Sequence, residues 1–463
     1  MKTWIIIWLI AFLMLSCQKK EKPPVLAKVD GKEISLEEFK LAYQFNPFLA
    51  RVQNPDSAKW FLLKSLIAEK LIALNGPTND QQIQDLLEAY RHEATIEVFW
   101  KKVIEPKVTI TDSELQQAYL RSKIKKVVQY LIFTDHNEAR QAYQLIRQGM
   151  SFEQLAQLRG FDEHFILSDT LSFTGQLPHI EEQVFKMKVG EVSPPVKEGL
   201  YFFVLKVIGE QRDIFTSEED FNYRENSLRK KLKRQRMQKA MEQFLAQNLP
   251  QTPYQLSKEK VKQLLKVIEK RIFENHKFGK NEGLTSDLSF LPDELANDLL
   301  NLPLVDFYYG ERWTVKYLLK RLSVSSYPLR FDNRGLFRKS FLLALKNILD
   351  DQIILHEAQQ RNLHNSDYVK QQVAIWRDYL LFKKGLANIL KDKSLYNPQP
   401  IYEYLNKKTI HYVIKINKTM LDTVRLFKTD MAVLKQHFPG RLAVPVIPLL
   451  TGYDLQYQFE ESY

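Results

Sequence analysis

Cysteine is the scarcest residue type in this chain of 463 residues, where it occurs only at position 17. A single thiol excludes an intramolecular disulfide framework, a zinc site of the CxxC type and an iron–sulfur cluster, because each of these needs at least two cysteines. Whatever Cys17 does, it does without a second thiol from the same chain.

The short motifs of common catalytic and nucleotide-binding sites are also missing. The histidines form no HExxH zinc motif, since His356-Glu357 has no second histidine four residues after the first. Neither a GxSxG motif nor a Walker-type glycine loop occurs. We therefore expect no metal and no cofactor, and neither hydrolase nor nucleotide chemistry.

Neither charge sign is scarce, but the two are unbalanced. Lysine and arginine number 67 against 55 aspartates and glutamates, a net charge of +12 that suits nucleic acid, an anionic membrane or acidic clients equally. With 44% hydrophobic and 26% charged residues the chain is expected to fold. Its length favours two to four domains over a single core.

Long apolar runs are absent except at the N-terminus. Residues 4–16 read WIIIWLIAFLMLS after a short basic start that contains Lys2. A helix of that length spans about 20 Å, less than the ~30 Å hydrocarbon core of a bilayer. We interpret residues 1–16 as a cleaved secretory signal and expect the rest of the chain to lie outside the membrane. An exported protein meets no genome, so nucleic acid is excluded as a partner.

The end of this run resembles a lipobox, the processing site of bacterial lipoproteins. It reads Met14-Leu15-Ser16-Cys17, with methionine where leucine is usual. The resemblance implies that Cys17 becomes the lipidated first residue, followed by a polar tether that ends at residue 24. We interpret the protein as an outer-membrane lipoprotein on the periplasmic side. The alternative is an ordinary secretory signal with an incidental cysteine.

The mature chain contains an internal repeat. Residues 31–39 (GKEISLEEF) align with residues 310–318 (GERWTVKYL) without a gap. Both sequences predict a turn, a short strand and a helix that is capped by Ser35 or Thr314, with glycine supplying a positive φ in the turn. The match continues downstream, which indicates a duplication.

Further matches follow in the same order along the chain. The apolar spacing of residues 63–73 recurs at residues 345–355, as expected for equivalent amphipathic helices. The remaining matched pairs of segments are 89–91 with 375–377, 115–120 with 400–405, and 129–132 with 411–414.

Beside this repeat, the sequence resembles the SurA, PpiC and PpiD group of periplasmic chaperones and prolyl isomerases. Residues 25–39 and 107–119 are similar to the N-terminal chaperone module of that group. The segments that follow the order of a parvulin domain, from first to last strand, are 127–133, 138–148, 152–158, 180–193 and 199–207.

The resemblance implies an α+β fold, in which duplicated, mostly helical SurA-like modules accompany an inserted parvulin-like domain with a small sheet. The expected segments are a signal peptide at 1–16, the lipidated cysteine and tether at 17–24, a helical module at 25–123, the parvulin-like domain at 124–213, a helical connector at 214–275, a second helical module at 276–399 and a degenerate strand unit at 400–463.

The resemblance also locates the isomerase site. A parvulin lowers the ~18–20 kcal/mol rotation barrier of an X-Pro bond in an apolar pocket, floored by two histidines near a cysteine or aspartate. The first-strand histidine falls on Gln129, and the last-strand histidine falls on Phe203 or its neighbour Phe202. Both histidines are therefore replaced.

The rest of the expected pocket is altered as well. Leu177 and Ile180 stand where the family usually has methionine and phenylalanine, and Asp162 alone matches the cysteine or aspartate. We predict a degenerate site without efficient catalysis. Since rotation needs no covalent chemistry, an active isomerase that uses Asp162 and Gln129 is the alternative.

Two further features have competing interpretations. The repeat places His411 where a second parvulin copy would have its first-strand histidine, but too little chain follows for such a copy, and an ordinary strand histidine is favoured. The basic run at residues 229–236 (RKKLKRQR) is interpreted as a solvated helix face rather than a site for anionic lipid or an acidic partner.

The function that fits these features is the binding of unfolded polypeptide. We predict a lipid-anchored SurA-like chaperone for unfolded outer-membrane or secreted proteins, with peptide contacts at Tyr130, Phe185 and Phe202. An active prolyl isomerase is one alternative. The other is a structural accessory subunit of an outer-membrane assembly or secretion machine.

Overall fold

The computed structural model describes most of the chain between residues 24 and 425. The residues outside this description are 1–23, 45, 47–48, 50–53, 78, 134, 159–165, 174–176, 199–200, 214–215, 276–294, 326, 328, 332, 392–398, 410, 426–449 and 451–463. The predicted signal peptide, Cys17, most of the tether and Asp162 lie outside the described residues. In the described part, no helix is both long and apolar enough to cross a bilayer.

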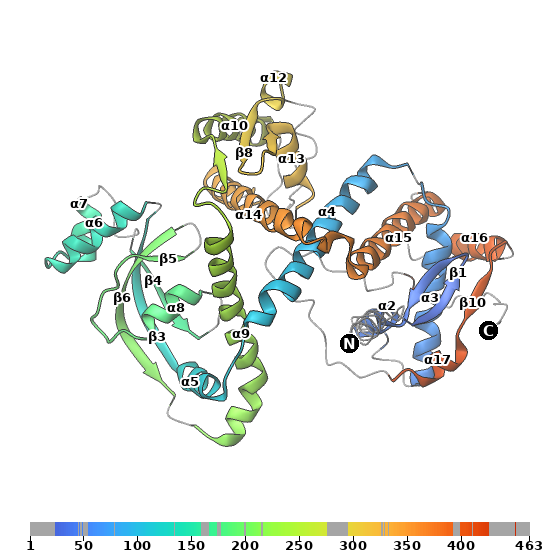
Figure 1. Cartoon of the computed structure of the whole chain (residues 1–463), viewed down its shortest axis with the longest axis horizontal. Helices are drawn as coiled ribbons and strands as arrows, with labels where there is room; N and C mark the ends of the chain where they lie inside the picture. Colours follow the sequence, from blue (N-terminus) through green and yellow to red (C-terminus); the bar gives the residue numbers. More distant parts are fainter. Residues whose placement is uncertain are drawn as a thin grey trace, which may run out of the picture. The chain divides into compact units, whose positions relative to one another are not determined.

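The chain divides into two compact units. Of the described residues, the first unit contains those before 96 and after 358, together with 324–327, and the second contains those in 96–323 and 328–358. Segments from the two ends of the chain, blue and red in Figure 1, therefore share the first unit. Helices dominate both units and the sheets are small, which confirms the predicted α+β fold. The predicted domain boundaries stay a prediction.

The first unit contains a three-stranded antiparallel sheet. β1 (Val25–Val29) and β2 (Lys32–Ser35) form a hairpin, and β10 (Ile414–Ile416) pairs with the other edge of β1. The hairpin turn has positive φ at Asp30 (47°) and Gly31 (83°), the combination found in a two-residue type I′ turn.

In this unit α15 packs against α3. A Cβ atom at Gly385 of α15 would lie 2.9 Å from Cγ2 of Ile72, so only glycine allows this approach without a shift. The helices described in this unit are α2 (Leu36–Gln44), α3 (Pro55–Ala73), most of α4 (Gln81–Phe99), η6 (Leu363–Asn365), α15 (Asp367–Leu390), α16 (Gln399–Thr409) and α17 (Lys418–Thr423).

The second unit contains a similar three-stranded sheet. β8 (Pro303–Phe307) and β9 (Arg312–Thr314) form a hairpin with Gly310 at φ 92° in its turn, and β7 (Tyr254–Leu256) pairs with the other edge of β8. β7 lies in the segment that was expected to be a helical connector. The accompanying helices are α10 (Lys258–Lys270), η5 (Arg271–Asn275), α12 (Asn297–Leu300), α13 (Val315–Ser323) and α14 (Arg334–Gln360).

The second unit also contains a four-stranded antiparallel sheet in the order β4-β3-β6-β5. Its strands are β3 (Ile124–Phe133), β4 (Leu167–Ser172), β5 (Val196–Glu198) and β6 (Tyr201–Arg212). The helices around it are α6 (His136–Arg147) and α7 (Phe152–Leu158) on one face, α8 (Pro178–Val184) on the other, and the flanking α5 (Asp112–Ser122) and α9 (Glu218–Asn248), with η2 (Trp100–Ile104) and η3 (Glu105–Lys107) before α5.

The described part of the C-terminal segment contains no second four-stranded sheet. Residues 411–413 form a turn, and the strand begins only at Ile414, so His411 is an exposed turn residue. The alignment of residues 411–414 with residues 129–132 is therefore wrong. Strand pairing sets β10 equivalent to β7, because the two strands occupy the same place in two similar sheets.

Candidate functional site

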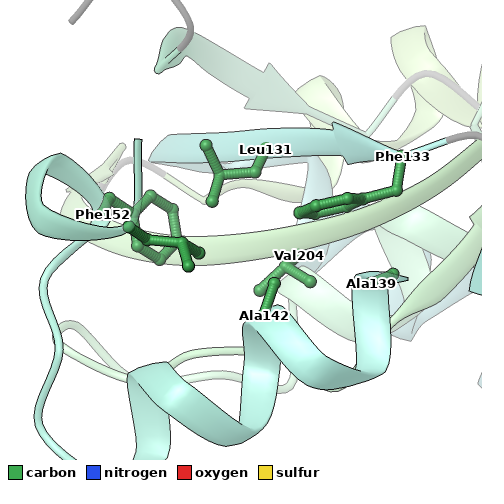
Figure 2. Packing of buried hydrophobic residues seen from close by; sticks show 7 residues of the cluster. Leu131, Phe133, Ala139, Ala142, Phe152 and Val204 are labelled. Atoms are coloured by element: carbon green, nitrogen blue, oxygen red, sulfur yellow. The ribbon is translucent and has the colours of Figure 1, made fainter. Parts of the chain in front are cut away.

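The four-stranded sheet has two differently covered faces, because successive side chains of a strand point to opposite sides. On one face Leu131, Phe133 and Val204 pack against α6 and α7, as Figure 2 shows. The cluster on the other face, which we call the α8-side cluster, consists of the buried Val128, Ile180, Val184, Met187, Leu205 and Val207 with the partly buried Tyr130, Leu171, Val196 and Phe203.

Two aromatic rings form part of the accessible surface of the α8-side cluster. The ring centres of Tyr130 and Phe203 lie 6.1 Å apart at an interplanar angle of 49°. Tyr130 is paired with Leu205 and Phe203 with Ile132 across β3 and β6, so the two rings are diagonal neighbours. Both rings are half-buried, whereas Leu205 is buried.

Gln129 and Phe202 lie on the opposite face of the sheet. Gln129 is paired with Lys206 across β3 and β6. Lys206 faces α7, where the pKa of Glu153 is lowered first by a backbone hydrogen bond and in addition by the charge of Lys206. Phe202 belongs to the cluster on the α6 side, where its ring centre lies 5.1 Å from that of His136.

This geometry divides the predicted histidine positions between the two faces of the sheet. Phe203 lies on the α8 side, so the residue of β3 that shares its site must point to the same face. That residue is Tyr130, whereas Gln129 shares its face with Phe202, the neighbouring position considered for the last-strand histidine. The assignment of the two histidine positions stays a prediction. In a strand, a slip of one residue moves a side chain to the opposite face.

The two residues that were expected to line the proline pocket lie at the start of α8 and directly before it. Ile180 is buried in the α8-side cluster, whereas Leu177 precedes the helix and is 38% exposed. Phe185 follows the helix and packs instead against the cluster of α5 and α9. The structure thus brings Ile180 together with Tyr130 and Phe203, and separates Phe185 from them.

The carboxylate of Glu198, which the sequence analysis did not single out, binds the start of α8. Oε2 of Glu198 accepts hydrogen bonds from the backbone amides of His179 (3.0 Å) and Ile180 (3.2 Å). Burial raises the pKa of Glu198, although these hydrogen bonds favour its charged form. Nε2 of His179 lies 3.0 Å from Oε1 of Glu242 on α9. Because Glu198 lies on β5, some twenty residues along the chain from the start of α8, no local sequence pattern predicted this contact.

The basic side of α9 is engaged in ion pairs. Arg236 pairs with Glu114 on α5, and Lys239 pairs with Glu182 on α8. Hydrogen bonding to Lys239 is the main reason that the pKa of Glu182 falls to about 2. Of these two basic residues only Arg236 belongs to the run 229–236, whose interpretation as a solvated helix face stays a prediction. A cavity of about 180 Å³ between α5, α8 and α9 lies outside the α8-side cluster.

The chemistry available on the α8 side is that of a phenol, a phenyl ring and aliphatic side chains. Burial, with a contribution from the charge of Asp169, raises the pKa of Tyr130, so the phenol stays protonated at neutral pH. Such a surface can bind an apolar or proline-bearing segment, but neither β3 nor β6 supplies an imidazole to it. Among the described residues, no group of His, Cys, Asp or Glu is arranged to hold a metal ion.

Comparisons with known proteins agree with this fold. Residues 110–213 match the family model of the PPIC-type PPIASE domain. The foldase protein PrsA of Geobacillus sp. (strain WCH70) is 23% identical over 237 residues, which are 46% of this chain and 82% of that protein. The parvulin-like PPIase of Rickettsia felis is 25% identical over 238 residues, 45% of this chain and 82% of that protein.

Solved structures that match part of this chain include PrsA from Bacillus anthracis, at 19% identity and a TM-score of 0.22, covering 40% of this chain and 96% of that chain. A SurA-like chaperone from Campylobacter jejuni matches at 17% identity and a TM-score of 0.20, covering 48% of this chain and 96% of that chain. The segment matched by the family model contains α5 and the whole four-stranded sheet. Residues 110–213 of this chain are therefore a parvulin domain of the PPIC type.

Proposed function

We propose that this protein is a lipid-anchored periplasmic chaperone whose parvulin domain binds unfolded outer-membrane or secreted polypeptides without efficient prolyl isomerisation. The family match supports a role in handling polypeptide, and the names of the relatives, foldase and PPIase, point the same way. The absence of efficient catalysis is the part that the site itself supports.

The observation that carries this proposal is the pairing of Tyr130 with Phe203. These two side chains occupy the face of β3 and β6 that packs on α8, next to Ile180, and Phe203 is one of the positions at which the family resemblance expects an imidazole. A phenyl ring cannot exchange a proton or a hydrogen bond with the rotating amide. Both rings do offer apolar area, which favours the binding of aromatic, aliphatic or prolyl side chains.

A protease-coupled prolyl isomerisation assay tests the catalytic half of the proposal. Positioned acid–base groups typically contribute 10²–10⁴-fold to a rate, so we expect kcat/KM at least about 100-fold below that of a parvulin domain with both histidines. The matched variant is Asp162→Ala, which should leave the low rate unchanged. Efficient turnover that Asp162→Ala abolishes would establish the active isomerase instead.

Peptide binding tests the other half. The double variant Tyr130→Ala/Phe203→Ala should weaken the binding of an unfolded outer-membrane segment rich in aromatic residues by at least about tenfold in Kd, because buried aromatic contacts carry much of such an interface. Tyr223→Ala is the control, since Tyr223 is 88% exposed on α9. The milder Phe203→Leu covers the case in which the double variant does not fold. Equal loss in the control and the site variants would refute the α8-side site.

The proposed anchor has its own test. Metabolic labelling with palmitate should modify the wild-type chain and leave Cys17→Ser unlabelled and released from the membrane fraction, because several acyl chains hold a protein firmly where none does. Retention of unlabelled Cys17→Ser in the outer-membrane fraction would show that another feature anchors the protein.

A further inference from the structure

The two small sheets share the pairing of their strands, including an irregularity. Each hairpin has a register shift at the same place in its first strand. The residue pairs on either side of the shift are Val25–Ser35 and Ala27–Ile34 in the first hairpin, and Pro303–Thr314 and Val305–Trp313 in the second. A bulge reproduced at the same register position is a feature of equivalent structures.

The third strands are equivalent as well. β10 pairs with β1 in the same antiparallel register in which β7 pairs with β8. The corresponding pairs are Ala27–Ile416 and Val305–Leu256, Lys28–Lys415 and Asp306–Gln255, and Val29–Ile414 and Phe307–Tyr254. Each third strand then leads into a helix that is capped by Asn417 or Ser257.

Backbone hydrogen bonds around these strands also correspond. The amide of Asn417 donates to the carbonyl oxygen of Leu26 (2.9 Å), as that of Ser257 donates to Leu304 (3.2 Å). In a second corresponding pair, the amide of Asp30 donates to the carbonyl oxygen of Val413 (2.9 Å), and the amide of Tyr308 donates to that of Pro253 (3.1 Å). The agreement extends over the bulge, the strand register, the helix caps and the flanking bonds, so β7-α10 and β10-α17 are equivalent strand–helix units.

The order of these units along the chain shows an exchange. In the first repeat, the hairpin and helices are followed by α5, the parvulin domain, α9 and then β7-α10. In the second repeat they are followed by α16 and then directly by β10-α17. Each strand–helix unit ends its own repeat, yet β10 completes the hairpin of the first repeat and β7 completes that of the second.

We infer that the chain is a covalently linked pair of repeats that have exchanged their terminal strand–helix units, and that a second copy of this chain can supply the same unit in trans. Without β10 the edge of β1 presents unpaired backbone groups that require a strand. The unit is identical in every copy, so an exchange between chains makes no contact that the single chain lacks. The tether within one chain favours the internal arrangement when the protein is dilute.

Co-refolding of two variants of this chain, each with a single introduced cysteine, tests this inference. Both carry Cys17→Ser. One also carries Lys28→Cys and the other Lys415→Cys, which are strand partners in β1 and β10. After joint unfolding, refolding at high protein concentration and mild oxidation, we expect disulfide-linked heterodimers of the two chains. Gln255→Cys with Asp306→Cys, the equivalent partners in β7 and β8, should behave in the same way.

The control uses Lys125→Cys and Gln211→Cys, exposed strand partners in β3 and β6 within one repeat. This pair should give several times less heterodimer, because β3 and β6 belong to one domain that closes on itself. Circular dichroism of each single variant checks folding. Heterodimer yields from the β1–β10 and β7–β8 pairs that do not exceed the control would overturn the inference. The result does not depend on isomerase activity or on client binding.

Discussion

Single charged residues tie the second repeat to the first. Lys70 on α3 lies 3.0 Å from a carboxylate oxygen of Glu38 and 2.9 Å from one of Asp378 on α15, and Lys32 also pairs with Asp378. Burial opposes the charge of Lys70, but the two carboxylates raise its pKa and keep it protonated. A buried charge of this kind is retained only while its partners stay in place.

Replacing Lys70 by methionine should destabilise the first unit. The variant Lys70→Met removes the cation that Glu38 and Asp378 share and leaves only Lys32 beside Asp378. Removing one partner of a buried ion pair costs about 3–5 kcal/mol. The control is Lys346→Met on α14, whose ion pair with Asp350 is partly exposed and should contribute less than about 1 kcal/mol. Urea unfolding measures both. A loss for Lys70→Met no larger than the control's would show that the cluster is energetically minor.

The same cluster predicts an acid dependence. Burial alone would raise the pKa of Asp378, but Lys70 and Lys32 lower it below 3.8. A carboxyl whose folded pKa is lowered contributes stability that is present above the unfolded pKa and is lost as the pH falls through the folded value. We therefore expect the contribution of Asp378 to disappear only below about pH 4. Asp378→Asn should flatten the fall in urea stability below that pH, and an unchanged slope would contradict the assignment.

At the scale of elements, local signals decided where hairpins and helices begin. The backbone amide of Glu38 donates to Oγ of Ser35 (3.1 Å) and that of Tyr317 donates to Oγ1 of Thr314 (3.3 Å), which confirms both predicted caps. Gly31 and Gly310 have the positive φ that the turn reading required. These features depend on a few neighbouring residues, so they were readable without the fold.

Alanine at either turn glycine should cost stability for a purely backbone reason. No atom lies within 4 Å of the Cβ that Gly31→Ala or Gly310→Ala would add, so the loss reflects only the left-handed conformation, about 1–2 kcal/mol each. Gly209→Ala in β6 is the control, with ordinary contacts to Val127 and no positive φ. Chemical denaturation compares the three. Turn variants that are as stable as Gly209→Ala would show that these turns rearrange.

At the scale of the whole molecule, each unit depends on strands from both halves of the sequence. β1 and β7 precede the region 276–294, while β8 and β10 follow it. Two sheets therefore join the halves by main-chain pairing, β10 to β1 and β7 to β8. Chain continuity between the halves is not what holds these sheets together.

A protease site placed between residues 275 and 295 should therefore cut the chain without separating its halves. We expect the two fragments to co-elute in native gel filtration and to separate only in denaturant, because each retains a strand in a sheet of the other. A cut in residues 392–398 is the control, since it leaves β7 and β8 unaffected and should weaken only the β1–β10 connection. Native separation of fragments cut between 275 and 295 would rule out mutual completion.

Sequence alone determined the features that depend on residues close together in the chain. Turn glycines, capping oxygens and apolar periods located the repeat, and the resemblance to the SurA, PpiC and PpiD group implied the parvulin domain before any fold was known. Only the tertiary structure decided which side chains of β3 share a face with α8, namely that of Tyr130 and not that of Gln129. It also decided that Glu198 holds α8 and that β7 and β10 complete opposite hairpins. Such pairings join residues far apart in the chain, and their free energy comes from shared burial and main-chain hydrogen bonds that no local pattern encodes.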